Sequence, residues 1–399
     1  MQIRQSNQRL NFDKNPTFEK DINPKQRAWI EVRGKALETN VRQLRSRLNK
    51  SCQFMAVVKA DGYGHDAKVV SEFAIKGGAS HLGVATLKEG VKLRSSGVKI
   101  PILILGNLYT KKDLTISFKN DLMPTISSIR ECLICNNIGK HFDLKFSLHL
   151  KVDTGMSRLG FESNKFVQQF DRIKSFENIT IEGIYSHLSS ADEHNSLNPE
   201  SSTQLQRQKF LELLKQINID RYHNIKIHLA NSAGMLLNKD FHFHMVRVGL
   251  SMYGYSPLTK IDKNLSLKPA LFLKVKVAFI RIIDKGVSVS YGGKFISSRK
   301  TKLAVLSIGY ADGVPRNLSG KLNVIHNKKL YPQVGSITMD QMMVDITDSN
   351  EIKIGSTMVL LGSDGDKTIS PIDWARKSNT IPWEILCSFK NRLPRVQID

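Results

Sequence analysis

The feature that most constrains the fold of this chain is a regular alternation of short apolar runs with amphipathic stretches. Eight runs of four to seven residues recur over about 230 residues, and most neighbours are separated by one stretch with helical spacing. Eight such units predict a closed parallel (β/α)8 barrel of the TIM type. The alternative is an open doubly wound sheet, but the GxGxxG fingerprint of its dinucleotide sites is missing. The runs are residues 54–58, 81–86, 101–105, 121–125, 145–151, 180–186, 225–230 and 245–248.

The pattern changes near residues 256–269, beyond which alternating apolar runs are separated by turns that contain glycine. This texture predicts a mostly-β domain with one short helix over 371–377. We therefore expect an α/β chain in three parts. These are a polar flexible extension over 1–24, the barrel over 25–262 and a C-terminal β domain over 263–399.

The formal net charge of +23 raises the question of a nucleic-acid partner. The basic residues are spread along the whole chain, and the densest clusters, 299–302 and 327–329, lack interleaved aromatic side chains that would stack on bases. A solvated, lysine-rich surface is the expected interpretation, with no nucleic-acid partner.

Targeting and membrane segments are not predicted. The first 24 residues contain no apolar signal-peptide core, and the apolar stretch 271–283 is interrupted by three charges. Four cysteines in 399 residues suggest a reducing compartment, so a cytoplasmic protein is expected.

Metal ligands at a recognisable spacing are also missing. Cys132 and Cys135 form one CxxC in a predicted helix over 127–137, with no second pair at zinc spacing. His242 and His244 have no acidic or cysteine ligands at matching spacing. We expect no metal site.

A lysine at the end of the first apolar run marks the strongest candidate for chemistry, in the segment AVVKADGYGH over 56–65. An amine is costly to desolvate, but in a partly desolvated pocket it loses its proton more readily and can form an imine with an aldehyde. Tyr63 lies in a glycine-rich loop and can hold an anionic group on that aldehyde. The alternative is that Lys59 merely extends along apolar surface to solvent.

The C-terminal ends of the other strands carry further polar groups, at the edge where barrel enzymes place their active residues. Lys151 ends the fifth run and Arg158 follows it. His187 follows the sixth run, Ser232 follows the seventh, and Arg247 lies in the eighth. Any one of them alone is typical of an ion-pair partner or a core residue. Their joint occurrence at successive strand ends favours an active site.

A phosphate site is predicted at the same edge. Hydroxyl groups and backbone N–H groups at helix N-termini bind phosphate. Tyr63, Ser232 and the amides of Gly249 and Leu250 can supply them.

Taken together, these motifs make the chain resemble the alanine racemases, which are fold-type III enzymes that use pyridoxal 5'-phosphate. Seven segments carry the resemblance in family order and cover nearly everything after residue 27. The resemblance implies a homologous fold and the interconversion of L-alanine and D-alanine, which supplies D-alanine for peptidoglycan. The segments are AVVKADGYGH (56–65), LKVDTGMSRLGF (150–161), HLANSAG (228–234), VRVGLSMYG (246–254), SYGG (290–293), GYADG (309–313) and GSITMDQMMVD (335–345).

The resemblance implies the catalytic pair by position. Lys59 matches the lysine that binds the cofactor aldehyde and serves as the base for D-alanine. Tyr291 matches the base on the opposite face, for L-alanine, so the mechanism has two bases. Arg247 matches the residue that faces the pyridine nitrogen, and because arginine gives up its proton with difficulty, that nitrogen stays unprotonated and the cofactor is a weaker electron sink.

Other roles are carried over in the same way. Tyr63, Ser232, Gly249 and Leu250 match phosphate contacts, and His187 matches the imidazole beside the cofactor ring. Arg158 matches a residue near the cofactor's phenolic oxygen and the substrate carboxylate. Lys151 matches a lysine that can be carbamylated to orient that arginine, and Tyr310 matches a tyrosine at the site entrance.

In the family, the residues that match Tyr291, Met339 and Asp340 come from a partner subunit, and Met339 is expected to contact substrate. The resemblance therefore implies a homodimer with shared active sites.

Four positions depart from the family pattern. Trp383 stands where a tyrosine commonly contacts the phosphate, Thr338 replaces a frequent cysteine, Ser336 a frequent arginine, and Asp66 a small residue. The first puts the phosphate contact in doubt.

Alternatives remain at this stage. A racemase of broader specificity, acting for example on serine, fits the same motifs, because a methyl-sized difference changes discrimination by only about 1–3 kcal/mol. A decarboxylase of basic amino acids is disfavoured by the segment around Tyr291 and by the short C-terminal domain. A single-barrel regulator that binds the same cofactor would lack that domain altogether.

Overall fold

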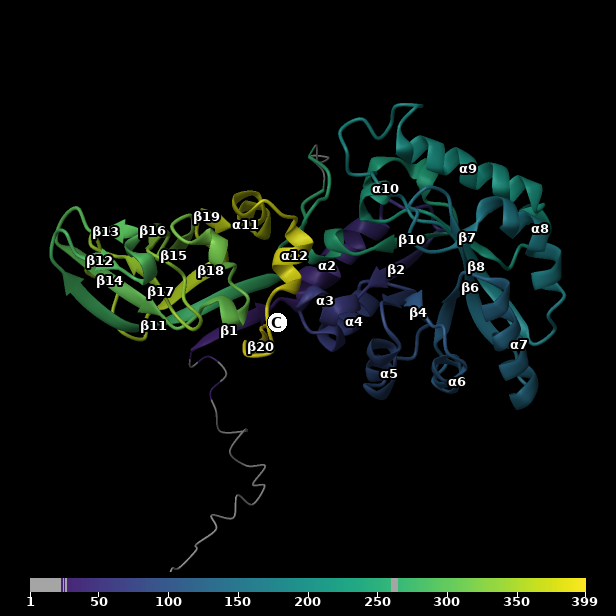
Figure 1. Cartoon of the computed structure of the whole chain (residues 1–399), viewed down its shortest axis with the longest axis horizontal. Coiled ribbons are helices and arrows are strands. Elements are labelled where there is room, and N and C mark those ends of the chain that lie inside the picture. Colours follow the sequence, from purple (N-terminus) through teal and green to yellow (C-terminus); the bar gives the residue numbers. More distant parts are fainter. Residues whose placement is uncertain (1–22, 24, 26, 260–264) are drawn as a thin grey trace, which may run out of the picture.

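A computed structural model describes residues 23, 25, 27–259 and 265–399. They form two domains that lie side by side, with α2, α3 and α12 near the junction (Figure 1). The predicted extension over 1–24 falls almost entirely outside the described residues. The predicted boundary at 262/263 also falls outside them, and both stay predictions.

Eight parallel strands close a barrel in the N-terminal domain, in the order β5-β4-β3-β2-β10-β9-β8-β6, with β6 paired back to β5. The predicted (β/α)8 fold is confirmed, and each predicted run supplies one strand. The strands are β2 (Gln53–Val57), β3 (His81–Val84), β4 (Ile102–Asn107), β5 (Met123–Ile126), β6 (Phe146–Asp153), β8 (Ile179–Tyr185), β9 (Lys226–His228) and β10 (Met245–Val248), with a short β7 (Phe161–Glu162) beside β6.

Helices pack around this barrel because their apolar side chains recur on one face. In α2, for example, Leu37, Val41 and Leu44 are fully buried. Side-chain caps fix several helix starts: Thr86 and Glu89 form a capping box on α5. The helices are α2 (Gly34–Arg45), α3 (Lys59–Tyr63), α4 (Ala67–Lys76), α5 (Leu87–Ser95), α6 (Lys111–Lys119), α7 (Ile129–Phe142), α8 (Ser163–Lys174), α9 (Ser202–Gln216) and α10 (Ser232–Leu237), with 3-10 turns η1 (Ile219–Arg221), η2 (Lys239–Phe241) and η3 (Leu250–Tyr253).

The C-terminal domain is mostly β, as predicted. Its strands β11, β14, β17, β16, β15 and β18 pair antiparallel in that order, and β18 pairs with β11 to close a second, smaller barrel. The strands are β11 (Leu271–Ile283), β12 (Ser288–Val289), β13 (Phe295–Ile296), β14 (Thr301–Leu306), β15 (Asn323–His326), β16 (Lys329–Val334), β17 (Met342–Asp345), β18 (Thr357–Asp364), β19 (Lys367–Ile369) and β20 (Arg395–Gln397). The helical turns are η4 (Tyr291–Gly293), η5 (Tyr310–Asp312), η6 (Arg316–Leu318), α11 (Pro371–Ser378) and α12 (Pro382–Cys387).

Strand β1 (Ala28–Val32) corrects one part of the predicted organisation. It precedes the barrel in the chain and fell within the predicted barrel range, but it lies in the C-terminal sheet, antiparallel to β11 and parallel to β20. All five of its residues are buried. From β1 onward the chain therefore passes from the C-terminal sheet into the barrel and back again, which ties the two domains together.

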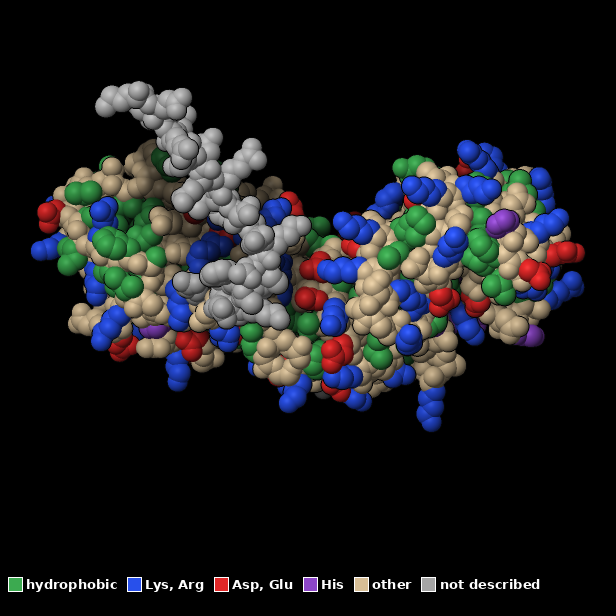
Figure 2. Space-filling model, turned by 90° about the horizontal axis from the view of Figure 1, so that it is seen from below, with side chains coloured by type: hydrophobic (Ala, Val, Ile, Leu, Met, Phe, Trp, Pro, Cys, Tyr) green, Lys and Arg blue, Asp and Glu red, His purple; other side chains and the backbone are tan. Residues whose placement is uncertain are grey.

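Charge is distributed over the surface of both domains. On the face in Figure 2, lysine and arginine side chains are scattered, with aspartate and glutamate among them. Within the described part of the chain, no helix is both long enough and apolar enough to cross a membrane.

Candidate active site

Lys59 begins α3 directly beyond the C-terminal end of barrel strand β2. The backbone that follows is left-handed: φ is 52° at Ala60, 52° at Asp61, 64° at Gly62 and 51° at Tyr63. A residue with a Cβ adopts this region at a cost of about 1–3 kcal/mol, so the surrounding structure must hold the turn in place.

Two groups from outside the turn supply that hold. Glu89 accepts from the Ala60 N–H through one carboxylate oxygen (2.7 Å) and from the Ala85 and Thr86 N–H groups through the other. Arg395, from the C-terminal domain, donates to the Gly64 carbonyl (3.1 Å). Sequence reasoning missed both residues; the only signal for Glu89 was its capping-box spacing from Thr86.

The amine of Lys59 lies in an electropositive site. Burial lowers its pKa, and the nearby Arg158 lowers it further, while Cys387 and Glu89 oppose the shift. Burial also lowers the pKa of Lys151 to about 8, with Arg247 and Arg158 adding to the effect. Amines and guanidinium groups gathered in this way suit a ligand with several negative charges.

The residues that are predicted to bind phosphate lie close to one another. The Tyr63 ring is buried and stacks on Tyr253 with ring centroids 4.7 Å apart. Ser232, the first residue of α10, accepts from the Gly249 N–H at 3.0 Å. A Cβ on Gly249 would lie 2.5 Å from the Tyr63 hydroxyl oxygen, so only glycine leaves this space open. Leu250 starts η3, and the N–H of the next residue, Ser251, donates to the same Ser232 hydroxyl at 3.5 Å.

Arg247 is buried in the barrel and surrounded by acceptors. It donates to the Ser186 and Leu229 carbonyls at 2.8 and 3.0 Å and to Nδ1 of His187 at 3.1 Å. Its other terminal nitrogen donates to Nδ1 of His228 at 3.0 Å. Burial lowers its pKa to about 10, which leaves the guanidinium charged at neutral pH.

Two histidines extend this series of hydrogen bonds, and sequence reasoning did not single out either of them. A guanidinium can only donate, so His228 accepts at Nδ1 and carries its proton on Nε2. That Nε2–H donates to Nδ1 of His149 at 2.9 Å. Burial, followed by nearby charges, lowers the pKa of His149 to about 3 and that of His228 well below its usual value. Both imidazoles are therefore neutral and brace Arg247.

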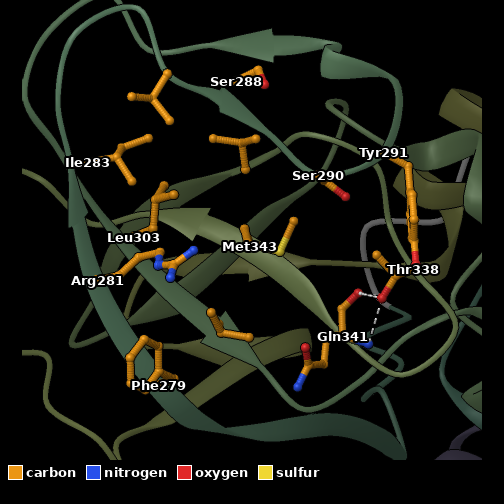
Figure 3. A pocket seen from close by; sticks show the side chains of 13 residues that line it. Phe279, Arg281, Ile283, Ser288, Ser290, Tyr291, Leu303, Thr338, Gln341 and Met343 are labelled. Carbon is orange, nitrogen blue, oxygen red and sulfur yellow. Dashed lines mark hydrogen bonds between the residues drawn. The ribbon is translucent and has the colours of Figure 1, made fainter.

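Tyr291 does not join this group in its own chain. It follows β12, which lies at the end of the C-terminal domain remote from the barrel, whereas α3 lies at the domain junction (Figure 1). The Tyr291 side chain is 71% exposed. It lies on the wall of a groove of about 590 Å³ whose lining includes Phe279, Arg281 and Met343 (Figure 3).

The other predicted residues of this domain are also exposed. Met339 is 52% exposed and Tyr310 40% exposed. Asp340 lies next to Met339 and accepts from Arg392 at 2.7 Å. The predicted site therefore divides into one group at the barrel mouth and one on the C-terminal domain.

Three of the departures from the family pattern have a visible structural use. Ser336 donates to the Tyr291 carbonyl at 2.8 Å and so fixes the backbone of that residue. Thr338 donates to the Gln341 carbonyl and closes its own turn. Asp66 caps α4 by accepting from the Lys68 and Val69 N–H groups. Trp383 is half-buried against the main core from α12, and its contact with a phosphate stays a prediction.

Comparison with known proteins gives a consistent result along nearly the whole chain. The family model for the N-terminal domain of alanine racemase matches residues 32–257, and the model for the C-terminal domain matches residues 270–397. An alanine racemase of the cyanobacterium Prochlorococcus marinus is 51% identical over 377 residues, which are 94% of this chain and 97% of the relative.

Solved structures agree with these sequence matches. An alanine racemase of Clostridium difficile 630 superposes with a TM-score of 0.87 at 32% identity, covering 93% of this chain and 96% of the other. The alanine racemase of Bartonella henselae, solved with covalently bound pyridoxal phosphate, superposes with a TM-score of 0.83 at 30% identity, covering 93% and 99% of the two chains.

Proposed function

The chain belongs to the alanine racemase family, and we propose that it interconverts L-alanine and D-alanine with pyridoxal 5'-phosphate as cofactor. The observation that carries this proposal is the convergence of a half-buried lysine amine, a cradle for a phosphate and a buried arginine at one barrel mouth. The proposal also includes the assignment of residue roles below.

The residues present fit this cofactor. Beside the Tyr63 hydroxyl lies a space that a Cβ on Gly249 would fill. The Ser232 hydroxyl accepts from the Gly249 N–H and can donate its own hydrogen, and hydroxyl groups of this kind bind phosphate. Lys59 would hold the cofactor covalently, Tyr63, Ser232, Gly249 and Leu250 would hold its phosphate, and Arg247 and His187 would face its ring. When bound, pyridoxal phosphate withdraws electrons from the substrate and so acidifies the hydrogen on Cα.

The chain's own groups then handle the proton. The lowered pKa of Lys59 increases the fraction of neutral amine, which accepts the Cα proton of D-alanine at Nζ. The Tyr291 hydroxyl acts on the opposite face, for L-alanine. Arg247 can only donate, so it would present a hydrogen-bond donor to the ring nitrogen of the bound cofactor and would favour that nitrogen without a proton. Arg158 binds the substrate carboxylate.

A second copy of the chain supplies Tyr291 in this proposal. Support comes from the exposure of Tyr291, Met339 and Tyr310 and from the groove beside Tyr291. Apolar side chains, among them Phe279, Ile283 and Met343, line this groove together with polar ones. Exposed apolar surface of this kind marks interaction sites. The homodimer would pair the C-terminal groove of each subunit with the barrel mouth of the other.

A chiral assay tests the proposed function. L-alanine is incubated with the protein, with and without added pyridoxal phosphate, and the two enantiomers are separated and quantified. We expect conversion towards an equal mixture that depends on the cofactor, and none with Lys59→Ala. An unchanged L-alanine pool with loaded protein would contradict the proposal. Faster conversion of L-serine than of L-alanine would instead favour the broader racemase.

A further inference from the structure

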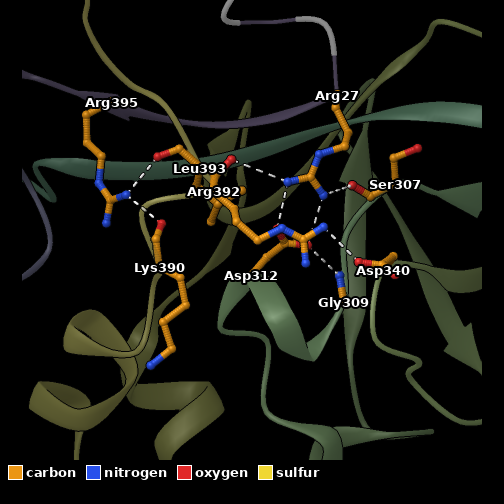
Figure 4. Close-up of polar contacts among 9 residues, drawn as sticks. All are labelled: Arg27, Ser307, Gly309, Asp312, Asp340, Lys390, Arg392, Leu393 and Arg395. Carbon is orange, nitrogen blue, oxygen red and sulfur yellow. Dashed lines mark hydrogen bonds and ion pairs between the residues drawn. The ribbon is translucent and has the colours of Figure 1, made fainter. Parts of the chain in front are cut away.

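A buried carboxylate joins four distant parts of the chain beneath the exposed loops of the C-terminal domain (Figure 4). The Asp312 side chain is 0% exposed. Arg27, just before β1, binds it through both terminal nitrogens, at 2.6 and 2.9 Å. The side chain of Arg392 lies 3.7 Å from the same carboxylate. We name Arg27, Asp312, Arg392 and Asp340 the Asp312 cluster.

The cluster is linked to two exposed loops through short contacts. Asp312 accepts from the Gly309 N–H at 3.0 Å. The next two N–H groups, of Tyr310 and Ala311, donate to the Thr338 and Met339 carbonyls, both at 3.0 Å. A Cβ on Gly309 would lie 2.2 Å from the Thr338 carbonyl oxygen, so the two loops pack backbone against backbone.

A direct ion pair closes the connection. Arg392 donates to Asp340 at 2.7 Å, so the same arginine touches the buried carboxylate and the second loop. A buried carboxylate needs its charged partners, because an unpaired charge in the interior is strongly unfavourable. The loops are therefore held by a cluster that is built on a fully buried carboxylate.

We propose that the Asp312 cluster positions the loops 309–313 and 338–341, so that Tyr310, Met339 and Asp340 complete the substrate pocket of a second copy of the chain. This inference rests on the shared site of the proposed function. Arg27 and Arg392 are positioning residues in it, acting through backbone and through Asp340. Their effect is exerted on the partner's Lys59 site and not on the site of their own barrel.

A local measurement tests the link from Arg27 to the loops. Arg27→Gln removes the two-pronged contact, and we expect faster hydrogen exchange at the Tyr310 and Ala311 amides with unchanged exchange in β2. Arg27→Lys keeps the positive charge but cannot contact Asp312 through two nitrogens. It should therefore restore the protection of these amides against hydrogen exchange only in part. Arg299→Gln is the matched control, because it breaks an exposed arginine–aspartate pair of the same domain (Arg299 to Asp348, 2.8 Å). Equal protection in Arg27→Gln and the control would overturn the link.

A pair of heterodimers tests action on the partner site. In the first, Lys59→Ala and Arg27→Gln are on the same chain, opposite a wild-type chain. In the second, they are on different chains. Each heterodimer has one intact Lys59 and one altered Arg27, so only the arrangement differs. We expect the KM for alanine to rise about tenfold in the first and to stay at the wild-type value in the second, because small misplacement of binding groups is costly.

The outcomes separate the inference from the proposed function. If the KM for alanine rises in the second heterodimer, or if it rises in neither heterodimer, the positioning role is overturned. Failure of a Lys59→Ala chain to regain activity with a Tyr291→Phe chain would contradict the shared site itself. If Arg27→Gln does not fold, Arg392→Gln replaces it in the same arrangement, because it removes the tie to Asp340.

Discussion

Lys151 is a buried amine whose pKa is lowered by burial and by the charges of Arg247 and Arg158, and this lowered pKa has a chemical consequence. The neutral amine can add to CO2, forming a nitrogen–carbon bond and releasing one proton, and the resulting carboxylate would sit beside Arg158 and Arg247. Because burial and these cations lower the pKa from 10.5 to about 8, the neutral fraction rises as the pH passes through that value.

We therefore expect carbamylation of Lys151 to increase between about pH 7 and about pH 9. The measurement is ¹³C NMR of the protein in labelled bicarbonate, with Lys151→Ala as the control that lacks the signal. A carbamate signal that survives in Lys151→Ala, or none at any pH, would contradict this expectation. In the unmodified protein the sign of the linkage is that stability rises with pH between about 8 and 10.5, because the unfolded chain binds more protons there.

In the proposed mechanism Tyr291 and Lys59 serve different enantiomers, so removing the Tyr291 hydroxyl should affect the two enantiomers unequally. Tyr291→Phe should slow release of the α-hydrogen of L-alanine by about 10²–10⁴-fold, the usual contribution of a positioned acid or base, and that of D-alanine less. Exchange of each enantiomer's α-hydrogen into deuterated water measures this. Equal slowing for both enantiomers would argue against two bases on opposite faces.

The secondary-structure elements determine which parts of the site could be predicted from sequence. The ends of β2, β6, β8, β9 and β10 follow from apolar runs, so Lys59, Lys151, His187, Ser232 and Arg247 could be assigned to one barrel edge from sequence alone. The left-handed turn after Lys59 could not be predicted, because it depends on Glu89 and Arg395, which are distant in sequence. The helix α12 is only six residues long and gave no periodic signal.

The turn after Lys59 offers a test at this scale. Gly64 has φ 78°, and a Cβ there would lie 2.4 Å from the Leu386 carbonyl oxygen, whereas Gly97 has φ 96° and no neighbour within 4 Å. Gly64→Ala should therefore lower the free energy of unfolding by more than Gly97→Ala, which carries only the conformational cost of about 1–3 kcal/mol. Urea unfolding of both variants measures the difference. Equal decreases in the free energy of unfolding would mean that the close contact with α12 does not restrict residue 64.

At the scale of the whole molecule, the division into two domains explains why some site residues could not be assigned from periodicity. The motifs placed Tyr291, Met339 and Asp340 in an active site only through family resemblance, since periodicity gave Tyr291 no distinction. In the structure these residues lie on the C-terminal domain and are exposed, and β12, which precedes Tyr291, lies at the end of that domain remote from the barrel (Figure 1). The crossing of β1 into that domain ties the two domains of one chain together. In the proposed homodimer, each subunit would supply half of two sites.

The most direct test of this account mixes two inactive variants, Lys59→Ala and Tyr291→Phe, after dissociation and reassociation. Random pairing makes half of the dimers mixed, and each mixed dimer holds one site with both groups, so recovery of about a quarter of wild-type racemase activity is expected. Activity no greater than that of the two variants measured separately would contradict the shared site.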